Sequence, residues 1–361
     1  MSLTLPERPV ASRRADAQVV ARVPLNGGGT AEFIRRVPAP AARRRSFRTG
    51  DIRETLLVAS CFLGGVLLPV RYWHRLIRAV VALGLSGVRS GKFAESFRPA
   101  FEAVTGASDP ENVRDAFEAF RGQTAAWRML AVREALPGRR NHPEIEVSGL
   151  PQLQASLSDG GALVWANQFF PQTICGKRAL WEAGLKAVQV TAEAHGFRDS
   201  AYGKAVLNPV LIRAETKYLA RRLIIRHGTE ATVTRGVLRS LAEGRVVIVT
   251  NNDYAGATFV ELPFGRSGIV AMATTIPRLA IRHGKPLFSM TAIELEPFTR
   301  YRVHIAPLYL PENDATDAGD EHARIAEIVA TARDRLLEHV LQAPDQYMAW
   351  LRAIVDDADD D

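Results

Sequence analysis

Short apolar runs that alternate with helical segments constrain the fold of this 361-residue chain more than any other feature. The runs begin after Pro143 and read GALVWAN, AVQVTAE, RVVIVTN and PLFSMTAIEL, and each has the composition of a strand. Segments 209–226 and 234–243, which lie between them, have apolar residues at helical spacing. YRVHIAPLYL adds a further expected strand and 318–342 a closing helix. This alternation predicts the α/β class, with a central sheet covered by helices on both faces.

Composition divides the chain into four parts. They are a basic, flexible arm at 1–50, a helical portion at 51–142, an α/β core at 143–355 and an acidic tail at 356–361. The arm is rich in Arg, Ala, Pro and Gly and has no sustained apolar period. In the helical portion, Asp109 and Pro110 have the residue types of a helix cap and a first helical position.

The net charge of +7 is unevenly distributed, because residues 1–53 hold eleven arginines against four acidic residues. A basic front end favours an anionic partner, either a membrane surface or nucleic acid, although a solvated arm without a partner has the same composition. We expect no nucleic-acid partner, because the arm lacks interleaved aromatic residues and any known binding module. Cys61 and Cys175 give neither a disulfide framework nor metal-ligand spacing, so we expect a reducing compartment and no metal site.

The run from Thr55 to Ile77 is the first long apolar segment of the chain. Because it begins this late, we expect no secretory signal. Pro69 interrupts it, and its apolar part before Arg71 is shorter than the roughly 20 apolar residues that a membrane-spanning helix needs. Its RYWHR sequence places aromatic and cationic side chains together, as at a membrane interface. Two interpretations stay open, a helix lying in the plane of a membrane surface and an ordinary core helix.

Polar residues follow three of the apolar runs directly. These segments are Asn167 to Gln172, Glu193 to Asp199 and Asn251 to Tyr254. In open α/β sheets, ligands bind in the crevice beyond the carboxyl ends of the strands. We therefore expect a functional crevice to be formed by these three segments.

Five longer segments occur in an order that is characteristic of one family. They are GGALVWANQFFPQTICGKRAL, NPVLIRAETKYLARRL, RGVLRSLAEGRVVIVTNNDYAG, FVELPFGRSGIVAMATTIPRLAIRHGKPLF and APDQYMAWLRAIV. They resemble the catalytic-motif strand, the Asn-Pro-led helix, the L-x-x-G turn with its strand, the Pro-Phe-Phe-Gly block and the Pro-x-Gln-Tyr-x-Trp ending of the bacterial lipid A late acyltransferases. That family belongs to the wider lysophospholipid acyltransferase group, and the resemblance covers about 150–352.

The resemblance implies a mixed central sheet of the glycerolipid acyltransferase kind, and an enzyme of lipid biosynthesis. Such an enzyme moves a fatty acyl group from an acyl carrier protein or coenzyme A thioester to an amine or hydroxyl of a lipid or small-molecule acceptor. The thioester is a co-substrate, and no further cofactor is implied. The resemblance also implies a cytoplasmic protein on the inner face of the cell membrane, seated by its helical N-terminal portion. The Thr55–Ile77 run and the basic arm agree with an anionic membrane surface as partner.

The chain departs from the family at its working motif, a histidine followed five positions on by an acidic residue. That histidine takes a proton from the acceptor, and the carboxylate orients its ring. Aligned on GALVWA, the two positions hold Asn167 and Gln172; aligned on CGKRAL, they hold Phe169 and Ile174. Neither alignment restores the pair. An amide accepts no proton near neutral pH, so Asn167 cannot act as a general base.

Three explanations of this departure stay open. First, the base has moved to His195, which lies near Glu193 and Asp199, although a lone histidine after a strand is more often structural. Second, the acceptor is an amine, which attacks a thioester without prior deprotonation, while Asn167 and Gln172 donate hydrogen bonds to the developing oxyanion. Third, the protein is a catalytically inactive relative that binds acyl chains, lipid or acyl carrier protein.

Five further polar residues are candidates for catalysis or substrate binding. Asp253 in TNNDYAG would hold the acceptor or the carrier, but the same residues are good turn formers. Arg235 and Arg266 have the guanidinium geometry that matches phosphate, although exposed arginines are commonly just solvated. Thr274 and Thr275 precede IPRLAIRHG, and they would either cap a helix or contact a ligand at its start.

Overall fold

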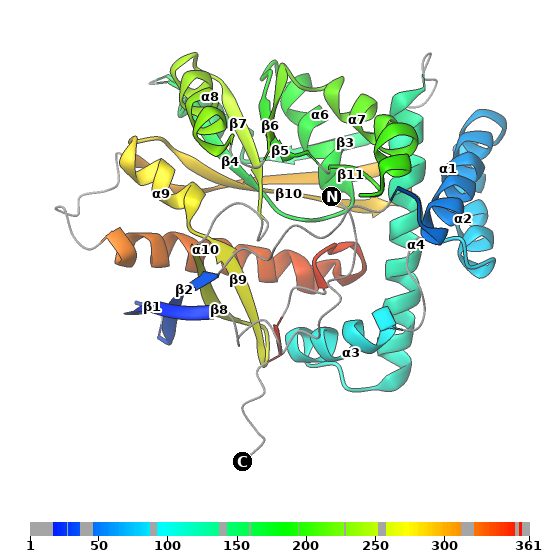
Figure 1. Ribbon diagram of the computed structural model, residues 1–361, viewed down its shortest axis with the longest axis horizontal. Helices are drawn as coiled ribbons and strands as arrows, with labels where there is room; N and C mark the ends of the chain where they lie inside the picture. The colour runs from blue at the N-terminus through cyan, green and yellow to red at the C-terminus, as the bar shows by residue number, and fades with distance from the viewer. Residues whose placement is uncertain are drawn as a thin grey trace.

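A computed structural model shows two sheets with helices packed around them (Figure 1). This arrangement is α/β, as the sequence predicts. The residues that the structure describes are 17–26, 28–36, 46–86, 92–136, 143–158, 160–193, 195–226, 229–251, 258–311, 321–350 and 354–355.

The larger sheet has seven strands in the order β3-β11-β10-β4-β7-β5-β6. The strands from β10 to β6 run parallel, β11 is antiparallel to β10, and β3 is parallel to β11. The apolar runs of the sequence form β4, β5, β7, β10 and β11, because a sheet covered on both faces needs continuous apolar residues; every residue of β4 is buried. Segment 209–226, expected to be helical, is helical only in its first part, and its end forms β6. The bounds are β3 Glu144–Ser148, β4 Ala162–Ala166, β5 Val188–Ala192, β6 Arg221–Ile225, β7 Val246–Thr250, β10 Leu287–Glu296 and β11 Arg300–Tyr309.

Helices cover both faces of this sheet. Figure 1 shows α6, α7 and α8 on one side of it and α9 and α10 on the other. The carboxyl ends of β4, β7 and β5 therefore open between two helical layers, where a crevice is expected. The bounds are α5 Leu150–Ala155, α6 Cys175–Glu182, α7 Asn208–Thr216, α8 Glu230–Ala242, α9 Thr275–Arg282 and α10 Glu321–Gln342.

The smaller sheet is antiparallel, with the order β1-β2-β8-β9-β12. Its strands are β1 Ala17–Pro24, β2 Thr30–Arg36, β8 Thr258–Phe264, β9 Gly268–Ala273 and β12 Ile354–Val355. The flexible arm predicted at 1–50 is therefore wrong for β1 and β2. Val23, Ala31 and Phe33 are buried, and the Phe33 ring packs edge-on against His322 of α10, with 4.8 Å between ring centroids. The many arginines of this region obscured the alternation of apolar and polar side chains along β1 and β2. Residues 1–16 and 37–45, and the acidic tail 356–361, lie outside the described residues.

In the described part of the chain, four α-helices precede the larger sheet. α4 begins as predicted, because the Asp109 carboxylate accepts hydrogen bonds from the backbone N–H groups of Glu111 at 3.3 Å and Asn112 at 3.4 Å, with Pro110 as the first helical residue. α1 and α2 pack on the outer side of α4, and α3 packs near its beginning (Figure 1). The bounds are α1 Thr49–Leu67, α2 Trp73–Ala82, α3 Lys92–Thr105 and α4 Pro110–Ala135.

The apolar run from Thr55 to Ile77 is divided between two helices. α1 ends at Leu67, a short 3-10 turn follows Pro69, and α2 begins at Trp73. Among the helices of the described residues, none has both the length and the apolar character needed to cross a membrane.

Candidate functional site

Uncharged polar side chains meet where β4, β7 and β10 lie side by side. Asn167 follows β4, and its Nδ2 donates a hydrogen bond to Thr291 Oγ1 in β10 at 2.8 Å. Asn251 follows β7, and its Nδ2 lies 3.5 Å from Asn167 Oδ1. All three residues are buried. We call Asn167, Asn251 and Thr291 the amide cluster; it lies at the carboxyl edge of the sheet, where the sequence predicts the crevice.

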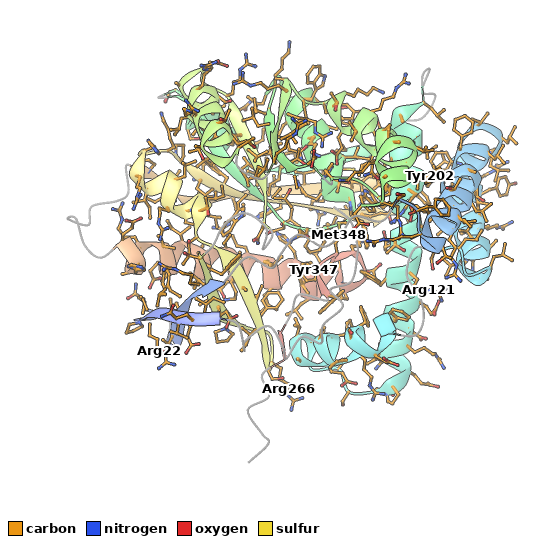
Figure 2. All side chains as sticks on the ribbon, viewed as in Figure 1. Arg22, Arg121, Tyr202, Arg266, Tyr347 and Met348 are labelled. Atoms are coloured by element: carbon orange, nitrogen blue, oxygen red, sulfur yellow. The ribbon has the colours of Figure 1, made fainter. Side chains whose placement is uncertain are left out.

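The C-terminal segment fixes the loop that carries Asn167. The backbone N–H of Met348 donates to Gln168 O at 2.8 Å, and that of Phe170 donates to Gln346 O at 3.1 Å. The Gln168 side chain in turn donates to Asn251 O. Figure 2 shows Tyr347 and Met348 in the middle of the molecule, below the larger sheet. The 344–350 segment is therefore part of the framework of the site.

Gln172 does not join the amide cluster. It lies in a 3-10 turn, Pro171–Thr173, and its side chain is buried. A Cβ atom at Gly176 would lie 2.3 Å from Gln172 Nε2, so the glycine makes room for this amide at the start of α6. Gln172 Oε1 accepts no hydrogen bond from the described residues. In the described structure, no hydrogen bond joins the side chains of Asn167 and Gln172.

His195 lies in a buried group of charges instead. Its Nε2 is 2.7 Å from Glu215 Oε2 of α7, and Lys177 Nζ of α6 is 3.0 Å from Glu215 Oε1. Burial lowers the pKa of His195 to about 4 against the attraction of Glu215. Burial also lowers the pKa of Lys177 to about 8, which Glu215 opposes. Burial alone would raise the pKa of Glu215, but His195 and Lys177 hold it well below its ordinary value.

These shifts define the protonation states of the group near neutral pH. Glu215 is ionised and paired with Lys177, and His195 is neutral. A carboxylate only accepts hydrogen bonds, so His195 Nε2 carries the hydrogen and its Nδ1 has the lone pair. Neither Asn167 nor Gln172 is hydrogen-bonded to His195. Of the two acids suggested beside it, Glu193 lies 3.6 Å from Arg226 and Asp199 lies 3.2 Å from Arg48.

Glu215 and Thr291 are the residues that the sequence argument missed. Glu215 lies on the Asn-Pro-led helix, four and seven residues after the buried Leu211 and Asn208 of α7, so its inward direction follows from helical spacing. Nothing in the local sequence marks Thr291, which lies inside an apolar strand 124 residues from Asn167.

The remaining candidates do not converge on the amide cluster. Arg235 is exposed on α8, where it bonds to Ala231 and Thr232 of its own helix at 3.4 Å. Arg266 lies in the turn between β8 and β9, at the opposite end of the molecule from α8 (Figure 2).

Thr274 and Thr275 occupy the beginning of α9. The buried Thr274 hydroxyl donates to Thr258 O of β8 at 3.1 Å and makes no capping bond, so it ties α9 to the smaller sheet. Thr275 is exposed. Asp253 lies outside the described residues.

Comparisons with known proteins leave the function to be argued from the site. No protein-family model matches the chain, and no curated protein matches it significantly in sequence. Among the described residues, no three or more His, Cys, Asp or Glu side chains converge as metal ligands would. What the described site offers is a set of fixed, uncharged hydrogen-bonding groups at the carboxyl edge of an α/β sheet.

Proposed function

We propose that this protein has an acyltransferase-like fold and moves a fatty acyl group from an acyl carrier protein or coenzyme A thioester to an amine or hydroxyl acceptor. The ordered resemblance of five segments to the lipid A late acyltransferases supports this reaction class. One observation carries the choice of mechanism: Asn167, at the position of the family's base, is held by the uncharged Thr291 and Asn251. This environment favours an amine as the acceptor.

The proposed chemistry needs no protein base. A neutral amine attacks the thioester carbonyl carbon, and the oxyanion that develops accepts a hydrogen bond from Asn167 Nδ2, which has two hydrogens and uses one on Thr291. The intermediate collapses to an amide and a thiolate, and the proton of the ammonium passes through water to the thiolate. The mechanism lacks general base catalysis, which contributes roughly a hundred- to ten-thousandfold to the rate. Positioning of the two substrates, which lowers the barrier by about 7–11 kcal/mol, offsets part of that loss.

The same observation supports a second candidate, a protein that binds acyl chains, lipid or acyl carrier protein without turnover. Among the described residues, no ionisable side chain is hydrogen-bonded to the side chains of the amide cluster. A fold that had lost its chemistry would show the same replacement of acid–base groups by amides.

The outer face of α1 supports a membrane surface as the place of action. Its inner face carries Asp51 and Glu54, both fully buried, whereas its outer face exposes a stripe of large apolar side chains: Ile52, Leu56, Phe62, Leu63, Val66 and Leu67. Beside the stripe, the guanidinium groups of Arg71 and Arg75 lie 5.0 and 5.6 Å from the Tyr72 ring. Such a combination suits an anionic lipid surface. We propose peripheral attachment to the inner, cytoplasmic face of the cell membrane.

Thiol release from acyl thioesters tests the proposal. Purified protein is incubated with acyl carrier protein and coenzyme A thioesters and a panel of amines and alcohols, and the product is identified by mass spectrometry. We expect release that depends on an amine. Asn167→Ala is expected to lower kcat by about a hundred- to a thousandfold, the usual loss for one oxyanion donor. Thr291→Val, which removes a partner of Asn167, is expected to lower it less.

His195→Gln separates the explanations, because glutamine keeps a donor for Glu215. We expect this variant to retain turnover, and its loss in a folded variant would assign the base to His195. Saturable binding of the thioester without turnover on any acceptor would support the second candidate.

A further inference from the structure

A groove of about 680 Å³ opens between the C-terminal end of α4 and the outer side of α7. Its walls are largely apolar and include Leu136, Pro209 and Ile212. A volume of this size is within the range of roughly 300–1,000 Å³ that is common for small-molecule sites. The groove is distinct from the amide cluster and from the charged group of Glu215, Lys177 and His195, because none of these residues lines it.

The rim of the groove is positively charged. Arg213 and Lys217 line it four residues apart, so they lie on the same side of α7. Arg213 is exposed, and among the described residues no carboxylate lies within ion-pair distance of it. Lys217 Nζ donates to the backbone oxygen of Glu134 at 3.2 Å. Glu134 also lines the groove, and its buried carboxylate accepts the hydrogen bond of Tyr218 and lies 3.9 Å from Arg133 Nε.

The apolar wall continues into the helices that carry the exposed stripe. Leu136 and Val210 pack against the apolar cluster formed by α1, α2 and α4. A methyl group at Gly65 of α1 would lie 3.7 Å from Leu136 Cδ1. Figure 1 shows α1 and α7 beside the same part of α4. An amphiphile at the outer surface of α1 therefore has a short, apolar path into the groove.

We propose that this groove is a binding site for an anionic phospholipid of the membrane, with one acyl chain along Leu136, Pro209 and Ile212 and the phosphate at Arg213 and Lys217. Guanidinium matches phosphate geometry, and a second cation four residues away suits a group with more than one negative charge. The proposal does not depend on acyl transfer, since no residue of the amide cluster lines the groove.

Calorimetric titration with soluble amphiphiles tests the site without a membrane. The probes are dodecyl phosphate below its micelle concentration, dodecylphosphocholine as the chain with a zwitterionic head, and inorganic phosphate as the head alone. We expect dodecyl phosphate to bind at least tenfold more tightly than dodecylphosphocholine, and inorganic phosphate not to bind measurably. Arg213→Gln should remove the preference for dodecyl phosphate, and Ile212→Asp should weaken both amphiphiles. Arg114→Gln, at another exposed helical arginine, should change neither.

Four outcomes would overturn the proposal. Equal binding of both amphiphiles, with no effect of Arg213→Gln, would indicate an apolar cleft without headgroup recognition. Binding of inorganic phosphate as tight as that of dodecyl phosphate would indicate an anion site without a chain. Dimerisation that Ile212→Asp abolishes, without amphiphile binding, would assign the groove to a second copy of the chain. No binding of any probe by the wild-type protein would remove the site altogether. Arg213→Gln is a surface change, so it tests the proposal even if Ile212→Asp does not fold.

Discussion

Helices α1 and α10 distribute their side chains in opposite ways. α10 buries apolar residues such as Ile325, Val329 and Leu336, as a helix packed on a core normally does. α1 buries Asp51 and Glu54 beside Leu57, Cys61 and Gly64, while Leu63 and Leu67 on its outer face are 59% and 71% exposed.

The buried acids of α1 are held by arginine side chains, which explains why this helix turns its charged side inward. Glu54 receives two hydrogen bonds from Arg128 of α4, at 2.7 and 3.1 Å, and the Arg128 guanidinium lies 4.8 Å from the ring centre of Trp127. Asp51 receives one from Arg198 at 2.9 Å. Because such bonds are directional, they fix the rotation of α1. Its apolar stripe is therefore held facing outward, which is costly in water and favourable at a lipid surface.

Removing Arg128, the partner of Glu54, should lower the stability of the protein and have the largest effect on the difference between α1 and α10. Arg128→Met leaves Glu54 buried without its partner, and a broken buried pair costs about 3–5 kcal/mol of stability. The free energy of unfolding from urea titration, followed by tryptophan fluorescence, measures this loss. Glu54→Leu combined with Arg128→Met should restore most of it, because no unpaired charge is left. A loss below about 1 kcal/mol in the single variant would contradict a structural role of the pair.

Charging the outer face of α1 should remove binding to anionic vesicles. Burial of one leucine side chain contributes about 1.5–3 kcal/mol, so Leu67→Asp is expected to lower the partition coefficient at least tenfold in co-sedimentation. The matched control is Leu341→Asp on α10, since Leu341 is 52% exposed and lies outside the stripe. Equal effects of the two substitutions, or none from either, would show that α1 is not the membrane face. Added salt should weaken binding further by screening Arg71 and Arg75.

Acid should loosen α1 through Asp51, whereas in α10 it acts first on His339, whose pKa is lowered by burial. Burial acts to raise the pKa of Asp51, but the Arg48 backbone and Arg198 hold it below its ordinary value. A carboxyl group with a lowered folded pKa stabilises fully above its unfolded pKa of about 4, and that contribution is lost as the pH falls further. Hydrogen exchange, corrected for intrinsic rates, should therefore show α1 amides losing protection below about pH 4. Asp51→Asn should abolish this loss in α1, and an equal loss in the variant would argue against it.

The fold was more predictable than the site because the two depend on different kinds of information. The strands β4, β5, β7 and β10 follow from local apolar runs, and the start of α4 follows from Asp109 and Pro110. The position of Asn167 and Asn251 at one sheet edge follows from the rule for parallel strands. The β1–β2 hairpin was missed because its composition is dominated by arginine, although alternate side chains are apolar.

The sequence by itself determined the α/β class, the position of Asn167 and Asn251 at the carboxyl edge of the sheet and the absence of an acid–base pair at Asn167 and Gln172, because each depends only on residue types and their spacing. Tertiary structure alone decided that Asn167 bonds to Thr291, that His195 faces Glu215, and that α1 turns its charged side inward. Those contacts join residues 20 to 147 positions apart. The physical reason is that pairing of buried charges and amides depends on which elements pack together, and no local pattern encodes that packing.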